Sequence, residues 1–271
     1  MTAASEVFQF ATEGRRIAYR DTGEGPPLVL LHGGFLDHRM WDDQIPALAA
    51  EYRVIAPDAR GHGESSNANG PFRPTDDVAD LLRRLDTGPA ILVGLSMGAA
   101  TAVDTALEHP DLVRAVVASG AGTSEPEFTS PWTVGVNTAW TKALAAGDID
   151  GWLDAFTLFA PGPHRPLDAV DPGVVRRLRA MCDHTVRKHT TGEPPLITPV
   201  ADTWARASRI RVPVLALNGS LDADDHLAMS ARLIAAVPHG RTALIDAAAH
   251  YPNMERPAEF TAALTDFLRT L

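Results

Sequence analysis

The chain has 271 residues, enough for one large domain or for a domain with an insert. Its hydrophobic content of 45% and charged content of 21% are ordinary for a globular protein with a sizeable core. A formal net charge of −10, without any Lys/Arg block, argues against a nucleic-acid-binding surface. No apolar run is long enough to cross a bilayer. We therefore expect neither a nucleic-acid partner nor a membrane.

The cysteine count and the first residues bear on the compartment. Cys182 is the single cysteine and cannot form an internal disulfide. The stretch "MTAASEVFQFATEG" lacks the basic region followed by an apolar region that is typical of a signal peptide. Because free thiols fit a reducing compartment, we expect a cytoplasmic protein.

Apolar strands alternate with helices over the first 120 residues. Residues 6–10 and 16–20, joined through Glu13-Gly14, are typical of an antiparallel hairpin. The segments "LVLLHGG" and "RVIAPDARGHGES" predict buried strands that run into glycine-rich loops. The pattern then predicts, in order, a helix over 76–85, a strand over 90–95, a helix over 99–108 and a strand over 113–119. This alternation predicts a mainly parallel sheet covered on both faces.

The alternation stops between about residues 121 and 208, where no strong strand pattern occurs. This stretch is interrupted by Pro161-Gly162-Pro163 and Gly192-Glu193-Pro194-Pro195. The helical segments expected between these breaks are 131–146, 149–159 and 172–188. Strands in "VPVLALNGS" and "TALIDAAAH", around a helix over 225–237, then resume the pattern, and a helix over 258–268 closes it. We predict a core of residues 1–120 and 209–271 and a helical cap of residues 121–208.

The segment "AILVGLSMGAA" places Ser96 between a buried strand and a helix rich in small residues. The pattern Gly94-x-Ser96-x-Gly98 in that context is the nucleophile-elbow signature of α/β-hydrolases. Glycines at both flanks allow a very tight turn, and the strained turn displays the serine hydroxyl at the carboxyl edge of the sheet. The sequence therefore predicts Ser96 as a nucleophile.

A serine nucleophile needs a base, and the base needs a carboxylate partner. His250 follows the last predicted strand and precedes the last helix, where this fold carries its histidine. Asp222 lies in the loop after the strand "VLALN"; its neighbours Asp224 and Asp225 fit the alternative role of acids at a helix N-terminus. The loop after the preceding core strand, "ASGAGT", has no carboxylate, which favours Asp222. The histidines that we expect to be ordinary surface residues are His38, His109, His164, His184, His189 and His239.

Two backbone N–H groups are expected to form an oxyanion hole. One belongs to Met97, directly after the nucleophile. The other lies in the loop His32-Gly33-Gly34-Phe35, where we favour Gly34, with Phe35 as the adjacent alternative. We expect His32 to brace this loop.

Two further clusters of polar residues do not match metal or phosphate motifs. The loop of residues 58–65 lacks the Lys and Ser/Thr of a phosphate loop, and we expect it to be structural, with a contact between Arg60 and Asp58. Cys182, His184 and His189 offer too few ligands for zinc. We expect no metal and no cofactor.

Over nearly its whole length the chain resembles the α/β-hydrolase superfamily. The motifs that carry the resemblance are "LVLLHGGF", "DARGHGES", "GLSMGA", "LNGSLD" and "HYPNMERPAEF". The chain looks most like the small, cofactor-free esterase, lactonase and peroxidase-like members with a helical lid. The resemblance implies a triad of Ser96, Asp222 and His250 with Met97 and Gly34 as oxyanion donors. Epoxide hydrolases and haloalkane dehalogenases of this fold carry an aspartate where this chain has Ser96, which argues against both activities.

The resemblance implies a serine hydrolase that cleaves an ester or lactone of a small to medium apolar substrate through an acyl-enzyme. The residues expected to line the substrate pocket are Phe35, Trp132, Trp152, Phe156 and Tyr251. The same triad leaves two other reactions open, hydrolysis of a carbon–carbon bond and peracid formation. A non-catalytic ligand-binding protein is disfavoured because all three triad residues are present. The sequence does not specify the substrate or the oligomeric state.

Overall fold

The computed structural model of the chain describes residues 6–12, 15–189 and 193–271. The turn expected at Glu13-Gly14 and the residue Gly192 of the expected break lie outside these residues. Within them, no helix is both long enough and apolar enough to span a membrane.

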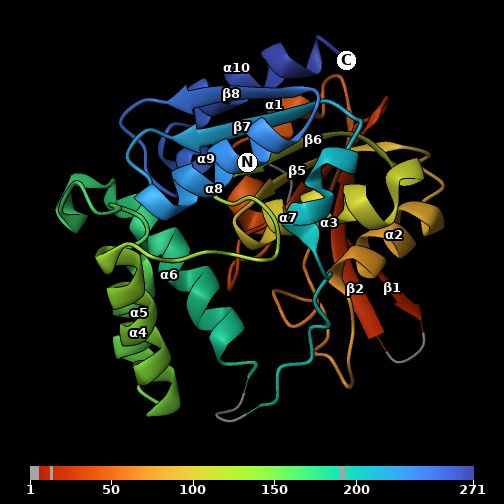
Figure 1. Ribbon diagram of the computed structural model, residues 1–271. Coiled ribbons are helices and arrows are strands. Elements are labelled where there is room, and N and C mark those ends of the chain that lie inside the picture. Colours follow the sequence, from red (N-terminus) through yellow and green to blue (C-terminus); the bar gives the residue numbers. More distant parts are fainter. Residues whose placement is uncertain (1–5, 13–14, 190–192) are drawn as a thin grey trace.

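A single twisted sheet forms the centre of the molecule (Figure 1). Its strands, in chain order, are β1 (Val7–Thr12), β2 (Arg15–Thr22), β3 (Pro27–Leu31), β4 (Arg53–Pro57), β5 (Ala90–Leu95), β6 (Val113–Ser119), β7 (Val214–Gly219) and β8 (Gly240–Ile245). In space the order is β1-β2-β4-β3-β5-β6-β7-β8. β2 pairs antiparallel with both β1 and β4, and all other neighbours pair parallel. The prediction of a mainly parallel sheet is confirmed.

Helices cover both faces because the central strands are apolar on both sides. In β3, Leu28 and Leu30 face one core, while Val29 and Leu31 face the other. The helices around the sheet are α1 (Ile45–Leu48), α2 (Pro74–Arg84), α3 (Met97–Glu108), α8 (Asp224–Ala236), α9 (Pro252–Glu255) and α10 (Pro257–Leu268). Residues of α2, α3 and α8 contribute to the core that contains Val29, and residues of α1 and α10 to the core that contains Leu28.

Three longer helices stand beside the sheet, between β6 and β7 in the chain (Figure 1). They are α4 (Pro131–Ala145), α5 (Ile149–Thr157) and α6 (Pro172–Val186), and we call them the cap helices. Their apolar side chains, including Trp152 and Leu178, continue the core around Leu28. The cap helices are therefore packed onto the body of the protein.

The last part of the predicted cap lies against the core. The short helix α7 (Thr203–Arg206) packs against α3. Trp204 of α7 stacks under the guanidinium of Arg232, 4.1 Å from the ring centroid, and its indole N–H donates to the carbonyl of Glu125 at 2.8 Å. The chain thus returns to the body of the protein before residue 208.

Candidate active site

Ser96 occupies a strained turn between β5 and α3. Its φ of 53° and ψ of −113° are outside the regions that L-residues ordinarily populate. A Cβ at Gly94 would lie 2.2 Å from the carbonyl oxygen of Gly98, and a Cβ at Gly98 would lie 2.2 Å from that of Leu31. Side chains at either flank would therefore force the turn open. The turn leaves Ser96 half-buried at the N-terminus of α3, whose positive end favours negative charge.

Asp222 and His250 form a buried pair at the same edge of the sheet. Nδ1 of His250 donates to Oδ2 of Asp222 at 3.0 Å, and the side chains of His250 and Asp222 are only 5% and 2% exposed. Asp222 follows β7, and His250 follows β8. Parallel neighbouring strands end at the same edge, which explains why residues 28 positions apart in the chain meet here.

Burial and charge shift the pKa values of this pair in ways that suit a general base. Burial alone would raise the pKa of Asp222, but the adjacent imidazoles of His250 and His226 outweigh it and hold this pKa well below its usual range. Burial lowers the pKa of His250 by more than the carboxylate of Asp222 raises it. His250 is therefore held in its neutral form, with the proton on Nδ1 and a lone pair on Nε2.

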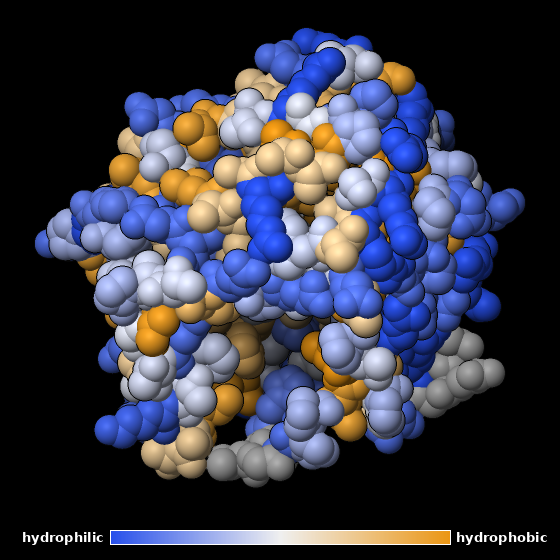
Figure 2. Space-filling model, in the orientation of Figure 1, coloured by the Kyte–Doolittle hydropathy of each residue, from blue (hydrophilic) through white to orange (hydrophobic). Residues whose placement is uncertain are grey.

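Ser96 and His250 line one cavity of about 190 Å³. No hydrogen bond joins their side chains in the described part of the chain; catalytic contacts of this kind often tighten only when substrate binds. Figure 2 shows one face of the molecule, with a hollow below its centre and hydrophobic residues on both sides of the hollow.

The loop expected to form the oxyanion hole lies beside Ser96. Gly33, Gly34 and Phe35 line the same cavity, and a Cβ at Gly34 would come 3.8 Å from Cβ of Met97. Within the described residues, the backbone N–H groups of Gly34, Phe35 and Met97 donate to no protein acceptor. Gly34 therefore lies at the cavity wall with Met97 next to it, directly after Ser96, and both N–H groups are without a protein acceptor among the residues that the structure describes.

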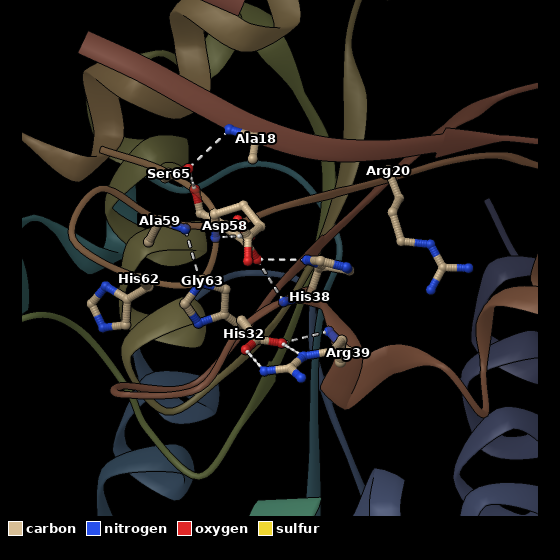
Figure 3. A network of polar contacts seen from close by, with 12 residues as sticks. Ala18, Arg20, His32, His38, Arg39, Asp58, Ala59, His62, Gly63 and Ser65 are labelled. Carbon is tan, nitrogen blue, oxygen red and sulfur yellow. Dashed lines mark hydrogen bonds and ion pairs between the residues drawn. The ribbon is translucent and has the colours of Figure 1, made fainter. Parts of the chain in front are cut away.

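A polar network joins this loop to residues 58–65 (Figure 3). His32 accepts from the N–H of Ala59 at 2.8 Å through Nε2, and its Nδ1 contacts the carbonyl of Gly33 at 2.8 Å. Asp58 accepts from Nδ1 of His38 at 2.8 Å and from the N–H of Glu64 at 2.8 Å. His32 thus braces the loop, as expected.

Two expectations about this region are wrong. Arg60 contacts Asp77 rather than Asp58, with Nε at 3.0 Å from Oδ2. Asp58 is fully buried, and its oxygens are already occupied by N–H groups of its own loop and of His38. His38, expected at the surface, is buried because it completes this network.

Aromatic side chains make up most of the remaining cavity wall. These are Phe35, Phe128, Trp140, Phe156, Phe159 and Tyr251. Three of the residues expected at the substrate, Phe35, Phe156 and Tyr251, are therefore at the cavity. Trp132 and Trp152 lie behind the wall instead: Trp132 packs on Phe159 at 5.7 Å between ring centroids, and the fully buried Trp152 packs on Phe35 at 4.6 Å. Two of the three tryptophans of the cap helices thus pack behind the wall, and Trp140 is the one that lines the cavity.

His226 is a cavity residue to which the sequence assigned no role. Its Nδ1 donates to Oδ1 of Asp222 at 2.9 Å, and its ring lies 4.3 Å from that of His250. Asp222 lies just before α8 and His226 in the first turn of that helix, so the available signal is their closeness in the sequence.

Two groups in the described part of the chain bring three possible metal ligands together: Asp222 with His226 and His250, and Asp37 with His38 and Asp58. In both groups imidazole N–H groups donate to carboxylate oxygens at 2.8–3.2 Å. A metal ion would have to displace these protons. The possible ligand atoms already have hydrogen-bonding partners, which for Asp37 are the N–H groups of Arg39.

A mostly parallel sheet, a serine in a strained strand-to-helix turn and a buried Asp–His pair at the same sheet edge define the class of α/β-hydrolase proteins. The comparison with protein families agrees. The chain belongs to the alpha/beta hydrolase family, whose model matches residues 28–264.

Named relatives are similar over nearly the whole chain. A pimeloyl-[acyl-carrier protein] methyl ester esterase of Aromatoleum aromaticum is 30% identical over 90% of this chain and 98% of its own. A 2-(acetamidomethylene)succinate hydrolase of Mesorhizobium japonicum is 29% identical over 92% of this chain and 90% of its own. Among solved structures, an enol-lactonase of Burkholderia xenovorans LB400 superposes with a TM-score of 0.79 at 27% identity, covering 96% of this chain and 99% of that one.

Proposed function

We propose that this protein is a serine hydrolase that cleaves carboxylic esters or lactones of small to medium apolar molecules through an acyl-enzyme. The observation that carries the proposal is the convergence of Ser96, the Asp222–His250 pair and the N–H groups of Gly34 and Phe35, which have no acceptor among the described residues, on one cavity. The esterase and lactonase named above add support for ester chemistry.

The reaction proceeds in two steps. Nε2 of His250 takes the hydroxyl proton as Oγ of Ser96 attacks the substrate carbonyl, and Asp222 stabilises the imidazolium. The N–H groups of Met97 and Gly34 stabilise the oxyanion, aided by the N-terminus of α3. Collapse of the tetrahedral intermediate expels the alcohol, which takes the proton from His250. A water molecule, deprotonated by His250, then hydrolyses the acyl-enzyme and releases the acid.

The aromatic wall favours an apolar acyl or alcohol group. The cavity volume of about 190 Å³ is below the range of drug-sized ligand sites and suits a small or medium molecule. A small-molecule substrate is thus the partner that we propose, and the cytoplasmic location stays a prediction.

The test is turnover of a panel of p-nitrophenyl esters and lactones of graded acyl length by the wild type and by Ser96→Ala. We expect the substitution to reduce kcat by a factor on the order of 10⁴ or more while leaving the circular dichroism spectrum unchanged. If the Ser96→Ala protein hydrolysed every ester at the wild-type rate, the proposal would be refuted.

A further inference from the structure

The active-site cavity contains a second buried imidazole that the proposed reaction does not use. His226 is 4% exposed and lies between three aromatic rings of the site. The ring centroids of Phe128, Phe159 and His250 lie 5.9, 5.8 and 4.3 Å from that of His226. A polar side chain in this position needs a reason, because burying it costs free energy unless its polar atoms are paired.

One nitrogen of His226 is paired inside the protein. Oδ1 of Asp222 accepts from the N–H of Ala223 at 2.7 Å and from Nδ1 of His226 at 2.9 Å, while Oδ2 accepts from His250. Because an ionised carboxylate only accepts, the proton of His226 is on Nδ1. The other nitrogen, Nε2, has no partner among the described residues, and His226 lines the cavity.

The proton state of His226 follows from its neighbour. His250 becomes an imidazolium in each catalytic cycle, and a second imidazolium 4.3 Å away would place two like charges on one carboxylate. The state compatible with turnover is a neutral His226 with a lone pair on Nε2. The cavity wall thus presents a hydrogen-bond acceptor beside the catalytic base.

We propose that His226 is a substrate-recognition residue, whose Nε2 accepts a hydrogen bond from an O–H or N–H group of the ester or lactone bound at Ser96. This inference rests on the proposed function and narrows its substrate class. Among the described residues that line the cavity there is no Lys or Arg. This lining argues against an anionic substrate, and we expect a molecule that is apolar where it meets the aromatic wall, with one donor group near the scissile carbonyl.

Other polar groups at the wall offer different chemistry. Oδ1 of Asn137 accepts from the indole N–H of Trp140 at 3.0 Å, which leaves the amide nitrogen of Asn137 as a donor. The Tyr251 hydroxyl can donate or accept. Tyr251→Phe is therefore the variant that separates recognition by His226 from recognition by its neighbour.

The experiment uses two pairs of p-nitrophenyl esters that differ by a hydroxyl in place of a methyl group. One pair is the 3-hydroxybutanoate and the 3-methylbutanoate, and the other is the 2-hydroxypropanoate and the 2-methylpropanoate. The readout is the ratio of kcat/KM for the hydroxy ester to that for the methyl ester. Comparing this ratio between variants cancels the intrinsic reactivity of each ester.

His226→Asn is the informative variant, because its amide N–H can still donate to Asp222 but no atom replaces Nε2. We expect the ratio to fall at least tenfold in His226→Asn for one pair or both, and to stay within twofold of the wild type in Tyr251→Phe. The exposed His239→Asn is the matched control and keeps the wild-type ratio.

A ratio within twofold of the wild type in His226→Asn for both pairs overturns the proposal, as does a tenfold fall confined to Tyr251→Phe. Wild-type rates in Ser96→Ala would refute the proposed function itself, which is a different result. If His226→Asn does not fold, inhibition of the wild type by 4-hydroxy-2-pentanone and 4-methyl-2-pentanone replaces it. We expect 4-hydroxy-2-pentanone to inhibit at least as strongly as 4-methyl-2-pentanone. Tenfold stronger inhibition by 4-methyl-2-pentanone overturns the proposal.

Discussion

A Cβ on Gly120 would lie 2.7 Å from Cε1 of His250 and 3.2 Å from Oδ2 of Asp222. Gly120 directly follows β6 and has a φ of 66°, a region that favours glycine. The absence of a side chain at the end of β6 is therefore what makes room for the Asp–His pair between β6 and β8.

Gly120→Ala tests this relationship. The added methyl group must displace the imidazole of His250, and we expect kcat/KM for a p-nitrophenyl ester to fall by a factor on the order of 100. Gly135→Ala is the control, because a Cβ at Gly135 meets no atom within 4 Å. Equal activity of Gly120→Ala and wild type would show that the pair tolerates the methyl group.

The pH dependence of kcat/KM reports on His250 in the free enzyme. Burial lowers the pKa of His250 below its ordinary value of 6.5, and the active form is the neutral one. Activity should therefore persist as the pH falls through 6.5 and be lost only at lower pH. Initial rates between pH 4.5 and 8, with folding checked by tryptophan fluorescence, measure the midpoint. An acid limb centred at or above pH 6.5 contradicts the assignment.

Lys188 lies just after α6, the last cap helix, and its side chain contacts the loop at 58–65 that begins with Asp58. Its ammonium group donates to the carbonyls of His62, Gly63 and Ser65 at 3.2, 2.7 and 2.5 Å. Hydrogen bonds to a charged donor stabilise by about 1.5–3 kcal/mol, so Lys188→Met should lower the free energy of unfolding by about 2 kcal/mol in urea denaturation. The exposed Lys142→Met on α4 should change it by less than about 0.5 kcal/mol. Equal losses of unfolding free energy in Lys188→Met and Lys142→Met would show that the three hydrogen bonds of Lys188 do not stabilise the fold.

Asp104 is a buried carboxylate on α3 with one weak partner, the N–H of Ser124 at 3.5 Å. Burial raises the pKa of Asp104 to about 6, while the unfolded chain ionises near 3.8. Ionisation at neutral pH therefore favours the unfolded state, and Asp104→Asn should raise the free energy of unfolding at pH 7.5 by about 2 kcal/mol. The gain should become small at pH 3.5, where Asp104 is protonated in the folded state and mostly protonated in the unfolded chain. If the free energy of unfolding of Asp104→Asn and of the wild type differed by the same amount at both pH values, ionisation of Asp104 would not be the cause of the difference.

Strands and helices could be predicted from the sequence where a buried apolar run is bounded by proline or glycine. The strands expected at 90–95 and 113–119 are β5 and β6 without change, because proline and glycine limit apolar runs there. The helix expected at 99–108 begins two residues earlier, at Met97, because Ser96 itself makes the turn. The contact between Asp222 and His250 follows from the parallel order of β7 and β8, which the alternation of strands and helices predicts.

Side-chain partners were less predictable because tertiary packing selects them. Arg60 contacts Asp77 because α2 packs beside the loop at 58–65 and brings a carboxylate within reach. Trp152 shares a helix face with Phe156, yet Phe35 inserts between the cap and the sheet and covers the larger ring. Asp222 and His226 are only four residues apart, but their contact depends on how the Asp222 side chain is oriented by tertiary packing.

The most direct test of the central claim is the position of covalent labelling by a fluorophosphonate, which reacts with activated serine nucleophiles. After digestion and mass spectrometry, we expect the label on the peptide that contains Ser96, its formation slowed in His250→Ala and abolished in Ser96→Ala. Label on a different serine, or no label on a folded wild-type protein, would contradict the assignment of Ser96 as the nucleophile.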